Sequence, residues 1–111
     1  MSDVLQNLAA VLEQRKSADP EKSYVASLHK QGLNKILEKV GEESTEVILA
    51  AKDASTGADN SDLVGEVADL WFHTIVMLSH LNVDVDEVTT CLAGRMGVSG
   101  IHEKSERKNS S

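Results

Sequence analysis

Aromatic residues, cysteine and proline are almost absent from this chain of 111 residues. One Trp, one Tyr and one Phe give an aromatic content of 3%, so the core must be built from Leu, Val, Ile and Ala. The scarcity of aromatic and β-rich runs favours helices over sheet. The single cysteine, Cys91, excludes an intrachain disulfide, which is typical of proteins from a reducing cytosol.

Long apolar runs and an excess of positive charge are also missing. No apolar stretch reaches the length that spans a membrane, and the N-terminus has no signal-peptide core. The net charge of −7 argues against non-specific binding to nucleic acid or to an anionic membrane. We therefore expect a cytoplasmic protein with no nucleic-acid or membrane partner. An anionic substrate would need a metal ion or a local cluster of cations.

The length and an apolar content of 41% fit one domain with a modest core. Apolar residues recur at helical spacing in segments at about 3–16, 20–31, 33–54, 61–81 and 86–95. The sequence therefore predicts an all-α bundle of four to five helices over residues 1–96. Asp19 is expected to cap the second helix, with Pro20 in its first turn. After Met96 the polar composition predicts a weakly ordered tail over 97–111.

The same periodicity predicts which side chains face inward. The fourth helix is apolar around much of its circumference, including Trp71, which predicts burial on more than one side, as in a central bundle helix or a dimer interface. Gly41, inside the third helix, either permits close packing or ligand approach, or is simply tolerated there. The other expected stripes are Tyr24, Val25 and Leu28 in the second segment, Leu33, Ile36, Leu37, Val40, Val47 and Ile48 in the third, and Val88, Cys91 and Leu92 in the last.

Two pairs of acidic residues stand out in the third and fourth helices. In the stretch GEESTEVILAAK at 41–52, Glu43 and Glu46 are three residues apart and project from nearly the same helix face. Glu66 and Asp69 have the same spacing on the next helix. Like charges on one turn repel, so a helix has no intrinsic reason to gather them, whereas a divalent cation supplies one. If the two helices pack antiparallel, the four carboxylates can enclose one or two metal ions.

Carboxylates are hard oxygen ligands, which suit Mg²⁺ or Mn²⁺ rather than zinc. Such ions would offset the negative charge, bind a polyphosphate and activate a water molecule. Lys39 lies on the acidic face, where it could pair with phosphate or with the carboxylates, and Glu42 flanks that face. His73 shares the face as a partner of the ligands, a base or a substrate contact. Lys52 falls off the face by helix geometry and Arg95 comes near the end of the last helix. Both are further candidates for phosphate contact.

The chain also matches a known family in several motifs that occur in order. It closely resembles phosphoribosyl-ATP pyrophosphatase, the second enzyme of histidine biosynthesis, in SYVASLHKQGLNKILEKVGEESTEVILAAK, in EVADLWFH and in the late GVSGIHEKSER. The resemblance spans about residues 20–104. The broader ExxE…ExxD pattern is similar to the all-α, MazG-type nucleoside triphosphate pyrophosphatases. The resemblance implies a helical fold that is usually dimeric, and Mg²⁺-dependent cleavage between the α- and β-phosphates.

Residue by residue, the resemblance puts the four carboxylates of the two acidic pairs at metal-ligand positions, and Lys39 and Glu42 at flanking ones. Phe72 stands where the family pattern has tyrosine, and Trp71 where leucine is common. These departures remove a hydroxyl and add bulk, and they leave the metal positions intact. Many relatives carry a fused cyclohydrolase domain, for which this chain has no room. We therefore expect a stand-alone, homodimeric pyrophosphatase.

The leading hypothesis is hydrolysis of phosphoribosyl-ATP to phosphoribosyl-AMP and pyrophosphate, in which Glu43 or Glu46 orients or deprotonates the attacking water. The alternative is a house-cleaning pyrophosphatase for another nucleotide, which would share the metal core. The SY…KVGEE and DLWFH contexts favour the histidine pathway. A helical scaffold with surface acids is a third hypothesis, and it predicts no saturable binding of Mg²⁺. A ferritin-like di-iron bundle needs Glu-x-x-His on two helices, and the sequence has no such motif.

Overall fold

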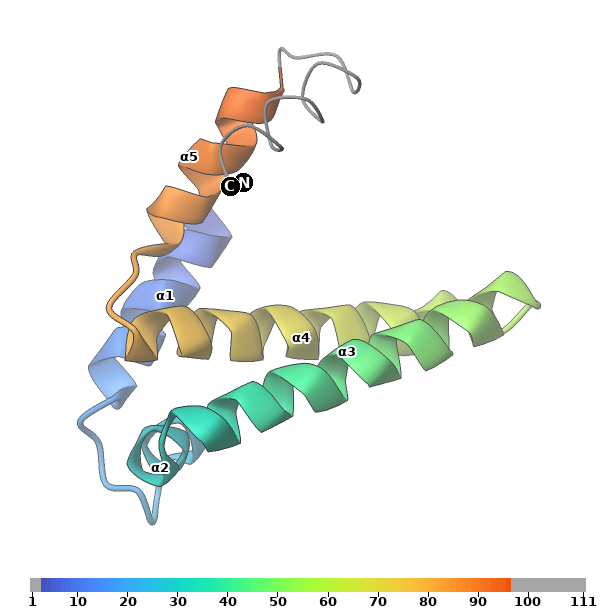
Figure 1. The fold of residues 1–111 in the computed structure, drawn as a ribbon. Helices are drawn as coiled ribbons and strands as arrows, with labels where there is room; N and C mark the ends of the chain where they lie inside the picture. Colours follow the sequence, from blue (N-terminus) through green and yellow to red (C-terminus); the bar gives the residue numbers. More distant parts are fainter. Residues whose placement is uncertain (1–2, 97–111) are drawn as a thin grey trace.

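The computed structural model describes residues 3–96, which form five helices and contain no strand (Figure 1). The helices are α1 (Asp3–Arg15), α2 (Tyr24–Gln31), α3 (Leu33–Ser55), α4 (Asn60–His80) and α5 (Val85–Arg95). The predicted all-α class and helix number are confirmed for this range. None of these helices has the length and apolar character needed to cross a bilayer. The expected tail at 97–111 lies outside the described residues.

The long antiparallel hairpin of α3 and α4 is the centre of the fold (Figure 1). Gly57, with φ of +105°, takes a left-handed conformation in the connecting loop, which glycine adopts without steric cost. Asp59 then caps α4, because its side chain accepts a hydrogen bond from the backbone N–H of Ser61 at 2.8 Å. A Cβ added to Gly41 would meet no atom within 4 Å, so close helix packing does not explain that glycine.

The hydrophobic core lies at the end of the hairpin away from this loop, where α3 begins and α4 ends. Each of four helices contributes one fully buried aliphatic side chain: Leu12 from α1, Leu28 from α2, Ile36 from α3 and Val76 from α4. Burial of such a side chain stabilises the fold by roughly 1.5–3 kcal/mol. α1 and α2 therefore hold one end of the hairpin together, and we call this region the packed end.

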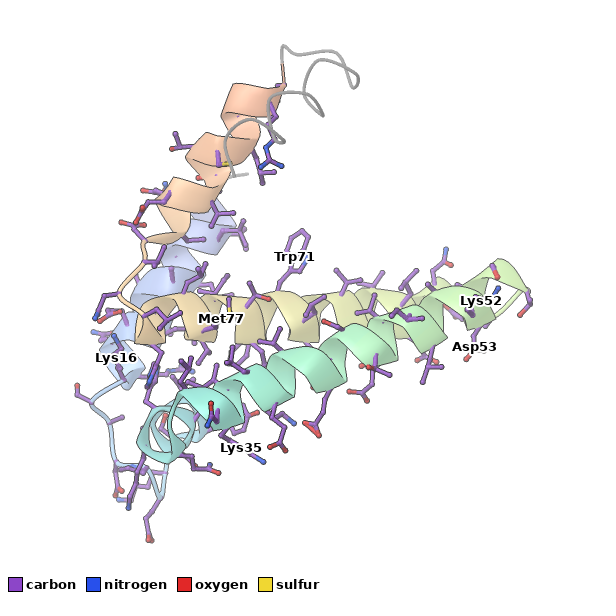
Figure 2. All side chains as sticks on the ribbon, viewed as in Figure 1. Lys16, Lys35, Lys52, Asp53, Trp71 and Met77 are labelled. Atoms are coloured by element: carbon purple, nitrogen blue, oxygen red, sulfur yellow. The ribbon has the colours of Figure 1, made fainter. Side chains whose placement is uncertain are left out.

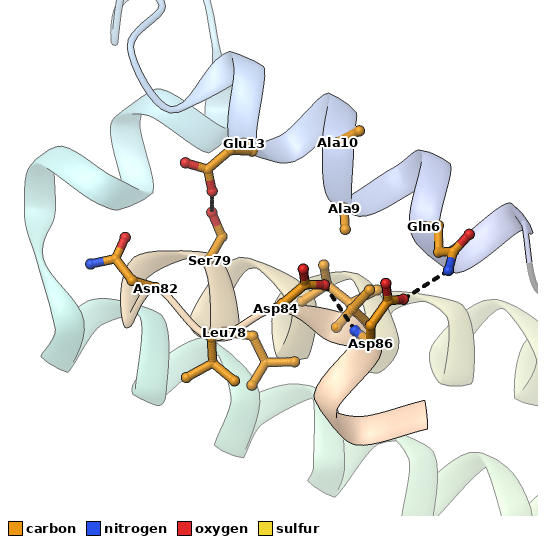
Figure 3. Close-up of a pocket in the computed structure, with 12 residues that line it drawn as sticks. Gln6, Ala9, Ala10, Glu13, Leu78, Ser79, Asn82, Asp84 and Asp86 are labelled. Atoms are coloured by element: carbon orange, nitrogen blue, oxygen red, sulfur yellow. Dashed lines mark hydrogen bonds between the residues drawn. The ribbon is translucent and has the colours of Figure 1, made fainter. Parts of the chain in front are cut away.

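Polar side-chain contacts also join α1 to α4 and to α5 (Figure 3). Ser79 of α4 donates a hydrogen bond to the Glu13 carboxylate at 2.7 Å, and the Gln6 amide donates to Asp86 of α5 at 2.8 Å. The hydrogen bond from Ser79, with a second from Lys16, lowers the pKa of Glu13. These contacts fix α1 across the end of α4 and beside the first turn of α5.

The second helix begins later than the sequence predicts. The carbonyl oxygen of Asp19 accepts the backbone N–H groups of Lys22 and Ser23, both at 2.9 Å, and so closes a separate turn around Pro20. Ser23 has extended backbone angles, and its hydroxyl accepts a backbone N–H three residues further on. The expected cap at Asp19 is therefore wrong, because serine at 23 caps the helix and α2 starts at Tyr24.

Several side chains expected to face inward are exposed instead. In α3, Leu37 is 43% and Ile48 is 64% exposed, and Trp71 of α4 is 55% exposed, projecting on the side away from α3 (Figure 2). The physical reason is that the 3.6-residue period identifies an apolar face but not the element that covers it. Near the loop, α3 and α4 pack against each other and no other described helix covers them, because α5 packs mainly on α1. In the last helix, three more side chains that were expected to face inward are exposed: Val88, Cys91 and Leu92.

Candidate active site

Antiparallel packing of α3 and α4 brings three of the four expected carboxylates together. One ligand oxygen from each of Glu43, Glu46 and Glu66 lies within 4.8 Å of the other two. We call these three residues the acidic cluster. The cluster does not include the carboxyl of Asp69, although Asp69 is close enough to raise the pKa of both Glu43 and Glu66 by repulsion. The three-residue spacing on α3 and the antiparallel hairpin together account for this arrangement.

The electrostatics of the acidic cluster favour a bound cation. Glu43 is only 8% exposed, and burial followed by repulsion from Glu46 raises the pKa of its carboxyl. Loss of solvent contact, followed by repulsion from Glu46 and Asp69, likewise raises the pKa of Glu66. A raised carboxyl pKa means that the ionised cluster is disfavoured in the folded chain. A divalent cation would reverse that balance.

Glu43 also supplies an observation that points directly to a ligand. Its Oε2 atom is buried and has no hydrogen-bond partner among the described residues. Leaving a buried acceptor unsatisfied costs about 1–3 kcal/mol, and more for a charged group. The fold gains nothing from this cost, whereas coordination of a hard divalent cation by carboxylate oxygens would offset it. The donor set therefore fits Mg²⁺ or Mn²⁺.

A groove of about 720 Å³ adjoins the acidic cluster between the loop-side halves of α3 and α4. Its volume lies in the range of small-molecule sites. Glu46, Glu66 and Asp69 line the end nearest the cluster, and the remaining lining includes Asp53, Asp59 and Asp62. Such an acidic surface repels a nucleotide phosphate unless cations bind first. A second cavity, of about 560 Å³, lies at the packed end between α1 and the α4–α5 junction (Figure 3) and contains no member of the cluster.

His73 is buried in α4, and both of its ring nitrogens have hydrogen-bond partners. Nδ1 is 2.8 Å from the backbone carbonyl of Asp69, which only accepts, so Nδ1 carries the proton and donates. Nε2 is then the acceptor for the hydroxyl of Tyr24, at 2.7 Å. The tautomer is thus assigned from the hydrogen-bond network. Of the three roles expected for His73, this geometry favours a partner of the ligands over a base.

The other expected site residues lie at different distances from the cluster. Lys39 forms an ion pair with Glu42, with Nζ 3.3 Å from Oε2, and this contact raises the pKa of Lys39. Both residues sit on α3 just before Glu43. Lys52 is exposed in the last turn of α3, toward the loop (Figure 2). Arg95 ends α5, which points away from the hairpin (Figure 1).

Tyr24 lies near the site, although no motif or spacing in the sequence indicates it. Its place in the short apolar stripe at 24–28 concealed it, but the ring is 51% exposed and stacks on Phe72, with ring centroids 6.4 Å apart. The SY motif within the family resemblance includes this residue but assigns it no role. The family pattern has tyrosine at position 72, where this chain has Phe72. Here the phenol beside that position comes from Tyr24 of α2.

The all-α hairpin, its clustered carboxylates and the adjoining groove are an arrangement that suits hydrolysis of a phosphate anhydride with the help of a bound cation. The family model for phosphoribosyl-ATP pyrophosphohydrolase matches residues 5–95. Because this match covers most of the chain, the chain belongs to the phosphoribosyl-ATP pyrophosphohydrolase family.

Family membership defines the reaction. The protein is a hydrolase of histidine biosynthesis that converts phosphoribosyl-ATP to phosphoribosyl-AMP and pyrophosphate. The match favours this activity over that of a house-cleaning pyrophosphatase for another nucleotide. Enzymes of this kind typically depend on a metal ion, and a cluster of acidic ligands is present in this chain.

Proposed function

We propose that Glu43, Glu46 and Glu66 bind Mg²⁺, or Mn²⁺ in its place, and that Asp69 joins them as a fourth ligand. The single observation that carries this proposal is the buried, unpartnered Oε2 of Glu43 within a cluster of carboxylate oxygens that lie within 4.8 Å of one another. Asp69 lies outside the cluster as defined by that distance, but it lines the same groove as Glu46 and Glu66.

The two glutamates of α3 differ in burial, and this supports different roles in hydrolysis. A bound divalent metal supplies a Lewis acid that polarises phosphate oxygens and lowers the pKa of bound water. Glu43 is buried, with an Oε2 that has no hydrogen-bond partner among the described residues, which suits a ligand. Glu46 is exposed and lines the groove, which supports a second role for it besides metal binding: to orient the attacking water and accept its proton.

The remaining candidates are proposed as contacts to the substrate or as support for such contacts. Lys39 carries a positive charge on the flank of the cluster, where Glu42 holds it. Lys52, near the far end of the groove, is proposed to contact phosphate or ribose oxygens. His73 is proposed to steady the backbone at Asp69, whose carbonyl accepts its Nδ1–H. A contact from Arg95 would come from a second copy of the chain, since α5 points away from the hairpin of its own chain.

We also propose that the enzyme is a homodimer and that it acts in the cytoplasm, where amino-acid biosynthesis takes place. Val64 and Trp71, seven residues apart on one face of α4, are 66% and 55% exposed, which is unusual for large apolar side chains of a monomer. The radius of gyration is 16.4 Å, against about 13 Å for a compact chain of this length. An open shape with an uncovered apolar face supports a symmetric dimer.

The test of the proposed site is turnover of phosphoribosyl-ATP by the Glu46→Gln variant at saturating Mg²⁺. The change keeps size and helix propensity but removes one charge from the cluster, so we expect turnover to fall on the order of 10²-fold or more. Glu38→Gln is the matched control, because Glu38 lies on α3 outside the cluster and forms an ion pair with the nearby Lys35. Near-normal turnover by Glu46→Gln would refute the assignment.

A further inference from the structure

Four residues of α4 that line the groove beside the acidic cluster share one face of the helix. They are Asp62, Gly65, Glu66 and Asp69. Residues that are three, four and seven positions apart lie on the same side of an α-helix. Gly65 therefore stands on the groove face, one residue before the proposed metal ligand Glu66. Because glycine has no side chain, the backbone of α4 itself forms the groove wall at this position.

Residues of α3 with the same spacing form the opposite wall. They are Glu46, Leu49, Ala50 and Asp53. The antiparallel register that brings the α3 and α4 members of the cluster together places Ala50 at the level of Gly65. Acidic residues precede and follow these positions on both helices, so the groove is acidic at its two ends and uncharged between them. We call Leu49, Ala50 and Gly65 the neutral section.

The fold itself does not explain a glycine at position 65. Gly65 lies in the interior of α4, where glycine lowers helix stability relative to alanine. Its φ is not positive, and a Cβ added to it would meet no atom within 4 Å, so neither backbone strain nor close packing of α3 requires glycine. The missing Cβ instead leaves space in the groove, where a ligand can contact the backbone of α4.

The substrate of this family has a part that matches the neutral section. Phosphoribosyl-ATP carries its triphosphate on a nucleoside, whose ribose and purine ring bear no negative charge. The triphosphate needs the cation that we propose at the acidic cluster, because bare carboxylates repel it. Ala50 follows Glu46 by four residues, or about 6 Å along α3, so a group joined directly to the α-phosphate reaches the neutral section. The acids at the loop end do not oppose a nucleoside, but they oppose a substrate that binds in the reverse direction.

We infer that the neutral section is the subsite for the nucleoside of the substrate, and that Gly65 determines specificity there, because its missing side chain admits the ring against the α4 backbone. This inference rests on the proposed metal site at the neighbouring end of the groove. Gly65 touches neither the metal nor the reacting phosphate in this arrangement. Its substitution therefore weakens binding of ligands that contain the nucleoside and leaves the metal and the chemical step unaffected.

The first test is the KM for phosphoribosyl-ATP of the Gly65→Ala variant. We expect KM to rise about tenfold, because one added methyl group overpacks an occupied subsite, while kcat at saturating Mg²⁺ stays within about twofold. The melting temperature should rise by about 3–6 °C, since alanine favours the helix and its Cβ meets no protein atom, so misfolding cannot account for a loss of affinity. Gly94→Ala is the matched control and should keep the wild-type KM, because Gly94 is an exposed glycine of α5 that does not line the groove, and a Cβ there also meets no atom within 4 Å.

Inhibition by the two products locates the effect within the groove. Pyrophosphate occupies only the phosphate end, whereas phosphoribosyl-AMP also carries the nucleoside. Gly65→Ala should raise the inhibition constant of phosphoribosyl-AMP about tenfold and leave that of pyrophosphate unchanged. An unchanged KM in Gly65→Ala would overturn the inference. An equal loss of inhibition by both products would also overturn it, because Gly65 would then act at the phosphate end.

The Glu46→Gln variant separates this inference from the proposal on which it rests. If Glu46→Gln loses turnover and Gly65→Ala keeps the wild-type KM, the metal site stands and only the nucleoside subsite is wrong. If neither variant differs from the wild type, the groove is not the substrate site and both conclusions are wrong.

Discussion

The two ends of the α3–α4 hairpin contain similar residues in very different surroundings. At the packed end, Ile36 and Val76 are fully buried, whereas toward the loop Ile48 and Val64 are 64% and 66% exposed. The helices are continuous from one end to the other, so local propensity does not explain the contrast. The difference is the cover that α1 and α2 provide at one end only. Stability is therefore concentrated at the packed end, and the other end is free to bind.

The acidic cluster lies at the transition between these two environments. Glu43 is buried, while Glu46 on the next turn is exposed and lines the groove. One carboxylate of the proposed site is thus shielded from solvent, and the other faces the groove. This location explains how a small chain can hold unpaired acids in a defined geometry without a large core around them.

The largest expected effect is on stability, and it tests whether the packed end carries the fold. Ile36→Ala should lower the free energy of unfolding by about 2–5 kcal/mol, because it leaves a cavity in the core. Ile48→Ala removes the same atoms from an exposed position and should change it by about 0.5 kcal/mol or less. Urea unfolding of both variants makes the comparison. Equal losses would mean that the open end is covered in solution.

A smaller effect is expected at the open end, on assembly rather than folding. Sedimentation at tens of micromolar should show a dimer, and Trp71→Lys should raise its dissociation constant about tenfold or more, since aromatic anchors dominate interfaces. Val4→Lys replaces a side chain that is 69% exposed on α1 and should leave the dimer intact. A monomeric wild-type chain at that concentration would contradict the proposed assembly.

The smallest effect concerns the pH dependence of the packed end. Nδ1 of His29 in α2 and Nδ1 of His80 in α4 form a hydrogen bond of 2.8 Å, and the rings stack. Burial, followed by repulsion from His80 and Lys16, lowers the pKa of His29 below its ordinary value of 6.5. The unfolded chain therefore binds a proton at His29 more readily than the folded chain does. The stability that the neutral histidine pair contributes is present above about pH 6.5 and is lost as the pH falls through the folded-state pKa of His29.

Thermal melting at about pH 7.5 and pH 5.5 measures this contribution. Acidification should lower the melting temperature of the wild type more than that of His29→Gln. The two decreases should differ by about 4 °C or less. The raised carboxyl pKa values of Glu43 and Glu66 act in the opposite sense, because they stabilise the folded state as the pH falls. These carboxyls are unchanged in His29→Gln, so the difference between the two proteins isolates the histidine pair. An identical loss in both would contradict this account.

The sequence alone predicted the helices that have strong local signals, and it predicted that the acidic pairs of two neighbouring helices face each other. The bounds of α3, α4 and α5 agree closely with the expected ranges, because apolar periodicity marks α3 and aspartates cap α4 and α5. Glu43, Glu46 and Glu66 meet because spacing on one helix and antiparallel packing suffice to bring them together.

The parts that the sequence did not predict depend on tertiary contacts. Periodicity cannot tell that Trp71 lacks a covering element, so it was wrongly expected in the core. The contact of Tyr24 with His73 depends on the angle at which α2 crosses α4, which no local pattern encodes. The carbonyl of Asp19 closes a separate turn and the hydroxyl of Ser23 caps α2 four residues later, and either residue type is a plausible cap from sequence alone.

The central claim is that the acidic cluster is a divalent-metal site, and calorimetric titration of the metal-free protein with Mg²⁺ tests it most directly. The account predicts saturable heat for the wild type and for Glu38→Gln, and loss of that heat when Glu43 and Glu46 are both changed to Gln. The double variant should also be at least as stable as the wild type without metal, because repulsion within the cluster is relieved. Absence of saturable heat in the wild type, or binding unchanged by the double substitution, would contradict the account.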